Sequence, residues 1–339
     1  MHRKLKIFDY TWNVADQYDM ICALKDDCEF YHCLNIRRQW DPSIRPVPDQ
    51  LKFVTGYKPG VYDLAILHID QQAINPKHKQ VLIYNEFNEC IIDIPKIVIN
   101  HGSPVFPEWF DELGSQFTEK EMDAACIYAI KSLVGESTMV VNSYTSCTVN
   151  EWGWGVPIIP GINSHEWLDL PKEPRAFTAL APYQLDCYYN RNCMMDVADI
   201  LYERHGHILI YAGLNIEKWN SIEAYKRYLG KSLLYIDTSI RTPINRTRTE
   251  AFLSGCCVVQ VEGAHDLEHW AKPGENMIIA PNNPEKIAAI IAEYLENKYE
   301  EAIVIGQNGK KMAIENFSLE HYHKGWLDLF YQLIPNCNI

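Results

Sequence analysis

Short, continuously apolar runs recur along the chain, and longer amphipathic stretches separate them. Because a strand that is covered on both faces needs apolar side chains on both, such runs predict parallel strands inside a helix-covered sheet. Strands that alternate with helices predict an α/β fold. The runs lie at 5–8, 28–31, 64–67, 81–84, 97–99, 139–141 and 157–160 in the first half, and at 177–180, 208–211, 233–236 and 257–261 in the second.

Helix signals fall between these runs. Thr118 and Glu121 form a capping-box pattern, and an apolar stripe follows it as far as Leu133. Pro284 takes a first helical position, and apolar residues then recur at helical spacing. Two further helices are predicted over 194–202 and 318–333.

The length of 339 residues is about twice that of one typical domain. Between the two sets of apolar runs, the segment 161–174 loses its periodicity and contains Pro171 and Pro174. This composition is typical of an interdomain linker. The sequence therefore predicts two α/β domains of similar size with a cleft between them.

The chain carries 31 basic and 44 acidic residues, a net charge of −13. A protein that coats duplex nucleic acid needs a basic face, so this balance argues against such a partner. No apolar run reaches the ~18 residues that cross a bilayer, and no apolar signal-peptide region follows the basic N-terminus. The eleven scattered cysteines are expected to be reduced, and the expected location is the cytoplasm.

The segment 236–259 carries the most chemical information. It predicts a strand, a loop, a short helix capped by Thr247 or Thr249, a helix end at Gly255 and a second strand. The loop therefore directs a helix N-terminus toward the carboxyl edge of a parallel sheet, which is a place that favours phosphate.

Charged residues cluster at this predicted helix start. Arg241, Arg246 and Arg248 supply up to three guanidinium groups for a phosphate or diphosphate. Glu250 adds a carboxylate, which suits paired sugar hydroxyls better than phosphate. The combination suits a nucleotide, and the alternative is an ordinary capped helix with solvated arginines.

The residues from Glu250 to Val259 read E-A-F-L-S-G-C-C-V-V. This run resembles the E-A-M-A-x-G-x-P-V-V segment of retaining GT-B glycosyltransferases, especially glycosyltransferase family 4. The run K-P-G-E-N-M-I-I-A-P at 272–281 is similar to that family's x-x-G-x-N-G-x-L-V-x-P, and 317–326 resembles its final F-S-W helix. The match is specific over roughly residues 232–327.

The resemblance implies a GT-B fold, in which two Rossmann-like domains face each other across a cleft. It implies an acceptor domain over 1–165, a nucleotide-sugar domain over 176–315, and a last helix over 316–339 that returns to the first domain. The implied enzyme is a hexosyltransferase that moves a sugar from a nucleoside-diphosphate donor to a hydroxyl acceptor, with retention and without a metal or other cofactor. The acceptor is a saccharide or glycoconjugate of unknown identity, and a lipid-linked acceptor would bring peripheral membrane contact.

The family's donor-site residues transfer to this chain only in part. Glu250 matches the second glutamate of the family's E-x7-E motif, which holds the donor ribose, but Thr242 stands where the first glutamate belongs. Arg191 is the nearest match to the family's diphosphate-binding Arg/Lys pair, and no lysine follows five residues later. Arg246 and Arg248 would supply the missing charge, and Thr249 completes the predicted donor-binding group.

Two residues of the first half are candidates for the acceptor side. His101 leaves the carboxyl end of a predicted strand, near the place of a family histidine. It would hydrogen-bond a sugar hydroxyl or shuttle a proton, or else bond a backbone carbonyl in the turn. Trp12 would stack on an acceptor sugar, or else belong to the core.

Three other interpretations stay open. His265, Glu268 and His269 match the H-x-x-E-H pattern of some zinc hydrolases, although no third ligand is evident. A nucleotide-sugar epimerase would share the fold. A catalytically inactive sugar-nucleotide-binding protein would explain the missing glutamate at Thr242.

Overall fold

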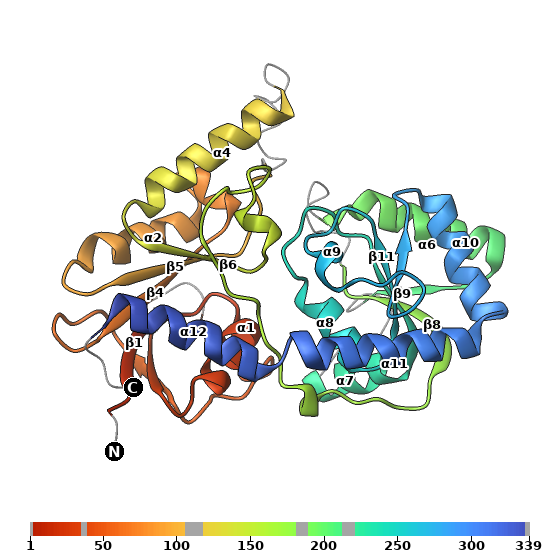
Figure 1. Cartoon of the computed structure of the whole chain (residues 1–339), viewed down its shortest axis with the longest axis horizontal. Coiled ribbons are helices and arrows are strands. Elements are labelled where there is room, and N and C mark those ends of the chain that lie inside the picture. Colours follow the sequence, from red (N-terminus) through yellow and green to blue (C-terminus); the bar gives the residue numbers. More distant parts are fainter. Residues whose placement is uncertain (1–2, 35–38, 106–117, 181–188, 212–220, 336–339) are drawn as a thin grey trace. The chain divides into compact units, whose positions relative to one another are not determined.

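The computed structural model describes residues 3–34, 39–105, 118–180, 189–211 and 221–335. The chain forms two compact units. Unit 1 comprises Met1–Gly161 together with Leu319–Ile339, and unit 2 comprises Ile162–Ser318. Each unit contains one parallel sheet with helices packed against it (Figure 1).

Unit 1 contains a seven-stranded sheet in the order β3-β2-β1-β4-β5-β6-β7. All of its strand pairs are parallel. The first strand therefore lies in the interior of the sheet, and the strand order reverses between β1 and β4. The strands are β1 (Leu5–Tyr10), β2 (Cys28–Cys33), β3 (Leu51–Val54), β4 (Leu64–Ile69), β5 (Lys96–Asn100), β6 (Thr138–Val141) and β7 (Val156–Pro157).

Helices cover both faces of this sheet, which explains its continuous apolar runs. Along β1, Leu5 and Ile7 join the core on one face, whereas Phe8 and Tyr10 join the core on the other. The first face packs against α1 and α12, and the second against α2 and α4 (Figure 1). These helices are α1 (Val14–Ala23), α2 (Lys79–Cys90), α4 (Glu119–Val134) and α12 (Leu319–Leu333).

The last helix belongs to unit 1 although the whole of unit 2 precedes it in the sequence. Trp326 and Phe330 of α12 are fully buried, four residues apart on one face of the helix. They pack in the same core as Val14 and Ile21 of α1. Unit 1 is therefore completed by residues that lie more than 150 positions further along the chain than Gly161.

Unit 2 contains a five-stranded parallel sheet in the order β12-β11-β10-β8-β9. Its strand order reverses between β8 and β10. The strands are β8 (Glu173–Thr178), β9 (Leu209–Tyr211), β10 (Ser232–Asp237), β11 (Cys257–Val261) and β12 (Ile278–Ala280). The helices among its described residues are α6 (Arg191–His205), α7 (Ile222–Lys231), α8 (Arg246–Leu253), α9 (Leu267–Trp270), α10 (Pro284–Glu296) and α11 (Tyr299–Asn316).

Two pairs of helices flank the sheet of unit 2: α6 packs against α10, and α8 packs against α11. The contact of α11 is unusually close at Gly306. A Cβ atom there would lie only 2.4 Å from the carbonyl oxygen of Gly255. Gly255 itself has a positive φ of 72°, as expected of the predicted helix end.

Two of the predicted strands differ in the structure. The run 81–84 belongs to α2, where Val81, Tyr84 and Phe87 are buried on one face while Leu82 is exposed. This spacing of three is helical, and the four apolar residues taken alone hide it. Of the run 157–160, only Pro157 lies in a strand, the two-residue β7, and the backbone N–H of Ile158 still donates to the carbonyl of Val141. Pro160 has no N–H with which to extend this pairing.

The segment 161–174, predicted as a linker, lies within unit 2 from Ile162 onward. Trp167 is buried, the backbone N–H of Leu170 donates to the carbonyl of Gly230, and β8 begins at Glu173. Within the residues that the structure describes, no helix combines the length and the apolar composition that a bilayer crossing requires.

Substitution of Gly306 by Ala is expected to destabilise the protein. Alanine normally favours a helix over glycine by about 1 kcal/mol, but the new methyl group would collide with the Gly255 carbonyl. The expected net loss is about 1–3 kcal/mol, measured by urea unfolding. Gly56→Ala is the control, because a Cβ at Gly56 meets nothing within 4 Å. Equal stability of the two variants would contradict the close contact.

Candidate functional site

In doubly wound sheets, ligands bind beyond the carboxyl ends of the strands, at the point where the strand order reverses. This point lies between β1 and β4 in unit 1 and between β8 and β10 in unit 2. Each unit therefore has one such position, and the polar side chains there are candidates for ligand binding.

In unit 2, Asp237 ends β10 at the reversal point and is fully buried. One of its carboxylate oxygens accepts hydrogen bonds from the backbone N–H and the hydroxyl of Ser239. The other accepts from the side-chain amide of Asn245 at 3.0 Å. Asp237 thus fixes both ends of the loop that leads from β10 into α8.

Asn245 is the N-cap of α8, so the prediction of Thr247 or Thr249 as the cap is wrong. The side-chain oxygen of Asn245 accepts from the backbone N–H of Thr247 at 3.1 Å, and α8 begins at Arg246. Asparagine is as good an N-cap as threonine. With the earlier start, Arg246, Arg248, Thr249 and Glu250 all lie inside the helix.

The structure buries Arg248 rather than directing it to solvent. Its side-chain nitrogen Nη1 donates to Gln260 Oε1 at 2.8 Å, and the residue is 5% exposed. Burial lowers the pKa of the Arg248 guanidinium, and the negative charges of Asp237 and Asp266 oppose that shift. Arg248 also lines a recess within unit 2, together with Trp270 and other, mostly apolar residues.

Glu250 is held by two neighbours on the side of α8 opposite to Arg248. Its Oε1 accepts from Arg246 Nε at 2.8 Å, and its Oε2 accepts from the hydroxyl of Tyr225 at 2.9 Å. Its side chain is only 4% exposed, and that of Arg246 is 15% exposed. Burial, and then the charge of Glu250, raise the pKa of Tyr225 well above its ordinary value.

The remaining donor candidates are Arg191, at the start of α6, and Thr249, inside α8. Arg191 is the first residue of α6, is partly exposed and lies beside Asn192. The hydroxyl of Thr238 donates to the carbonyl of Asn190, which ties this helix start to the end of β10. Thr249 is buried, and the buried hydroxyl of Thr242 donates to that of Ser239 at 3.3 Å.

The donor candidates therefore do not converge on one point. Residues two apart in a helix point in nearly opposite directions, so Arg248 faces away from Arg246 and Glu250. Arg191 and Arg246 are the candidates with partly exposed side chains. Arg248 and Glu250 are satisfied by protein partners, and a ligand would have to replace those partners to reach them.

In unit 1, four neighbouring strands carry a polar residue at the same place. In each strand, two apolar residues at alternate positions point to the face that α1 and α12 cover. The polar residue comes two positions after the second of them, on the same face. The triplets are Leu5, Ile7 and Asp9 in β1; Cys28, Phe30 and His32 in β2; Leu64, Ile66 and His68 in β4; and Ile97, Ile99 and His101 at the end of β5.

These four polar side chains form a chain across the sheet. His68 Nε2 lies 2.8 Å from Asp9 Oδ1, and His68 Nδ1 lies 3.0 Å from Nε2 of His101. On the other side of the carboxylate, His32 Nε2 lies 2.9 Å from Asp9 Oδ2. Asp9, His32 and His68 are fully buried, and His101 is partly exposed.

Asp9 is held in its ionised form. Burial alone would raise the pKa of its carboxyl group, but the charges of His32 and His68 and their contacts with the carboxylate outweigh this effect. The pKa of Asp9 therefore lies well below its ordinary value. Gln17 of α1 strengthens the arrangement, since its amide nitrogen donates to Asp9 Oδ2 at 2.8 Å.

Trp12 lies against the imidazoles of His68 and His101. Its ring stacks on His101 with a centroid distance of 5.3 Å and on His68 at 6.0 Å. Its backbone N–H donates to the side-chain oxygen of Gln17. Trp12 is 8% exposed, so most of its ring covers the histidines.

The sequence analysis identified His101 and Trp12 but missed Asp9, His32 and His68. Each missed residue lies within or just after a predicted apolar run, and none belongs to a recognisable motif. The signal that could have found them is the repeated placement of one polar residue at the carboxyl end of an otherwise apolar strand. Detecting it requires the strand order, because β1 and β4 are adjacent in the sheet but more than 50 residues apart.

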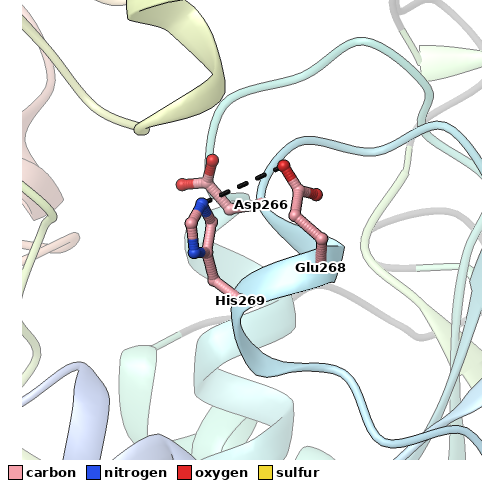
Figure 2. Close-up of side chains that lie close together, drawn as sticks. All are labelled: Asp266, Glu268 and His269. Carbon is pink, nitrogen blue, oxygen red and sulfur yellow. Dashed lines mark ion pairs between the residues drawn. The ribbon is translucent and has the colours of Figure 1, made fainter.

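The H-x-x-E-H pattern, one of the interpretations left open by the sequence, does not lie on a single helix. Asp266, Glu268 and His269 lie close together around the start of α9, with His269 Nε2 3.9 Å from Glu268 Oε1 (Figure 2). α9 is only four residues long and Asp266 has a positive φ of 61°, so His265 is not on the same helix as His269. In the described part of the chain, His265 is absent from this group.

No protein-family model and no curated protein sequence matches the chain. Solved structures do match. The structure of Anabaena HepE in complex with UDP-glucose has a TM-score of 0.66 at 14% identity and covers 97% of this chain and 100% of that one. Sucrose-phosphate synthase from Thermosynechococcus elongatus has a TM-score of 0.64 at 12% identity, covering 98% of this chain and 100% of that one.

A third similar structure, S. aureus TarM, has a TM-score of 0.56 at 15% identity. That match covers 78% of this chain and 55% of TarM. Together with the two parallel sheets, these likenesses show the fold. It is the GT-B fold of glycosyltransferases, as the sequence predicts.

Replacement of Arg248 by Met is expected to lower stability. The change keeps most of the side-chain volume but leaves the buried Oε1 of Gln260 without its donor. The expected loss is about 1–3 kcal/mol in urea unfolding. Arg204→Met is the control, because Arg204 forms an exposed ion pair with Glu285 that contributes little. Unchanged stability of the Arg248 variant would show that this arginine is not a structural group.

Proposed function

We propose that this protein is a glycosyltransferase that moves a sugar from a nucleoside-diphosphate donor to a hydroxyl acceptor. The observation that carries the proposal is the likeness to glycosyltransferase structures over 97–98% of the chain. The structure of HepE contains UDP-glucose. A uridine-diphosphate sugar is therefore the first donor to test.

Unit 2 is proposed as the donor unit. The N-terminus of α6 and the loop before α8 flank the reversal point of its sheet, where helix starts favour phosphate oxygens. Arg191 and Arg246 would supply cations for the diphosphate. Arg248 would support this edge from within, through Gln260, which in turn donates to the carbonyls of Asp237 and Ser239.

Glu250 is proposed to hold the donor ribose, as the motif resemblance implies. Its carboxylate would exchange Arg246 or Tyr225 for ribose hydroxyls, and the freed Arg246 would then be available to the diphosphate. Thr249 would act indirectly, by holding the start of α8, because its hydroxyl donates to the carbonyl of Asn245 at 3.4 Å. This exchange would make the carboxylate of Glu250 available to the ribose and the guanidinium of Arg246 available to the diphosphate at the same time.

Unit 1 is proposed as the acceptor unit, with His101 facing a hydroxyl and the edge of Trp12 contacting the ligand. The transfer is proposed to be retaining, because the segment from Glu250 to Val259 resembles retaining enzymes. It is also proposed to need no metal. Fixed guanidinium groups and helix N-termini would then stabilise the negative charge that develops on the leaving diphosphate.

Thr242 favours a second candidate function, a protein that binds sugar nucleotides without transferring the sugar. It stands in place of a donor-sugar glutamate, and its buried hydroxyl bonds Ser239 rather than facing a ligand. Such a protein would bind the nucleotide but would not turn it over.

UDP binding is expected to depend on Arg191. A lost charge-assisted hydrogen bond costs about 1.5–3 kcal/mol, so Arg191→Ala should raise the Kd for UDP by about 10–100-fold in isothermal titration. Arg204→Ala is the matched control, since Arg204 lies in the last turn of the same helix. Equal Kd values for the two variants would remove Arg191 from the donor site.

Turnover is expected with one of a panel of labelled nucleoside-diphosphate sugars, with hydrolysis as the readout when no acceptor is present. The released sugar or product should keep the anomeric configuration of the donor, measured by proton NMR, and a chelator should leave the rate unchanged. Nucleotide binding without any turnover would favour the binding-only protein. Neither binding nor turnover would refute the proposed function.

A further inference from the structure

We infer that Trp152 is a positioning residue for His101: its indole N–H holds the backbone at Gly102 and so fixes the imidazole of His101 against Trp12. All four residues belong to unit 1. The part that this arrangement plays in the reaction rests on the proposed function, in which His101 faces a hydroxyl of the acceptor.

Gly102 is the second residue after β5, and each of its backbone groups has a close neighbour. Its N–H donates to Oδ1 of Asn100 at 3.2 Å, and its carbonyl oxygen accepts from Nε1 of Trp152 at 2.8 Å. A Cβ atom at Gly102 would lie only 1.9 Å from Oε1 of Gln71, so its α-carbon is closely packed as well. The backbone of Gly102 is therefore held by Asn100, Trp152 and Gln71 together.

These contacts fix the direction in which His101 leaves the backbone. The backbone N–H of His101 donates to the carbonyl of Ile69 at 2.9 Å, which extends the β4–β5 ladder by one residue. The bond from Trp152 holds the peptide that follows Gly102. Because peptide groups are rigid and the backbone is held both before and after His101, the Cα–Cβ bond of His101 has little freedom to turn.

The burial of Trp152 makes its bond to Gly102 persistent. Trp152 is 1% exposed and packs in the core between the sheet and the helices α2 and α4. The indole N–H is a hydrogen-bond donor only, and the carbonyl of Gly102 is buried with its residue. Breaking the bond would deprive two buried polar groups of each other, which is costly.

Trp152 also joins two loops at the carboxyl edge of the sheet. It lies in the connection between β6 and β7, and its backbone N–H donates to the carbonyl of Ser146 at 3.1 Å. Gly102 lies in the loop that follows β5, the neighbour of β6 in the sheet. The bond therefore ties adjacent loops into one support for His101, at the edge where such sheets bind ligands.

The ring of Trp12 reports the position of His101. The two rings are stacked, with a centroid distance of 5.3 Å and an angle of 14° between their planes. Protons that lie over an aromatic ring resonate upfield. A displacement of His101 relative to Trp12 therefore changes the NMR signals of the imidazole.

Trp326 provides a matched control in the same unit. It is also 1% exposed, but it packs in the core on the opposite face of the sheet. Within the described part of the chain, its Nε1 has no hydrogen-bond partner. Loss of the indole N–H therefore breaks a hydrogen bond at position 152 and none at position 326.

The variant that isolates the bond carries the benzothienyl analogue of tryptophan, in which sulfur replaces the N–H in a ring of nearly the same shape. Trp152→Phe would remove the bond too, but it would also remove ring volume from the core and so lower stability. The analogue is placed in the full chain at position 152, and in a second protein at position 326.

Proton–carbon NMR of labelled histidine then tests the inference. The ring signals of His101, assigned by their loss in His101→Gln, should be shifted upfield in the unsubstituted protein. The analogue at position 152 should move them, and the analogue at position 326 should leave them in place. Comparison of the plateaus of a pH titration separates displacement of the ring from a change in its protonation. Unmoved signals at position 152, or equal movement in both proteins, would overturn the inference.

Turnover gives a second readout. If the protein turns over a donor, the analogue at position 152 should lower kcat by about 10–100-fold, since a misplacement of about 1 Å can cost that much, and should leave the Kd for UDP unchanged. The analogue at position 326 should keep kcat within a few-fold. An unchanged kcat at position 152 would overturn the positioning role. If the protein turns over no donor, the proposed function fails, while the NMR result still decides whether Trp152 holds His101.

Discussion

Both sheets of this protein are covered by helices on both faces, and this constraint governs where polar chemistry can occur. A polar side chain in the middle of such a strand would be buried without water. Polar side chains can therefore enter only near the strand ends, where loops and helix starts supply partners. Asp9 and His68 in unit 1 and Asp237 in unit 2 follow this rule, and each is satisfied by neighbours that the topology brings to the same edge.

The same constraint explains what could be predicted from the sequence. Most strands were recognisable because double-sided burial makes their apolar runs continuous. The α/β class and the GT-B fold followed from those runs and from the segment after Glu250. The run 81–84 was misassigned because four consecutive apolar residues can also fill one turn of a helix, here with Val81 and Tyr84 buried and Leu82 exposed.

The candidate sites were less predictable, because they depend on contacts between distant segments. The motif located α8 correctly, but whether Arg248 faces solvent or Gln260 depends on where the helix begins, and Asn245 sets that start. Likewise, Asp9 and His68 become neighbours only once β1 and β4 pair. His101 was found because it follows a strand, whereas its partners carry no local signal.

The return of α12 to unit 1 has a consequence for synthesis on the ribosome. Residues 162–318 form a contiguous unit, so unit 2 has all of its own segments before α12 has been translated. Until α12 emerges, the apolar side chains of β1, β4 and α1 that it covers lack their natural cover. The nascent chain therefore passes through a stage in which one half is complete and the other exposes a hydrophobic face, the kind of surface that chaperones recognise.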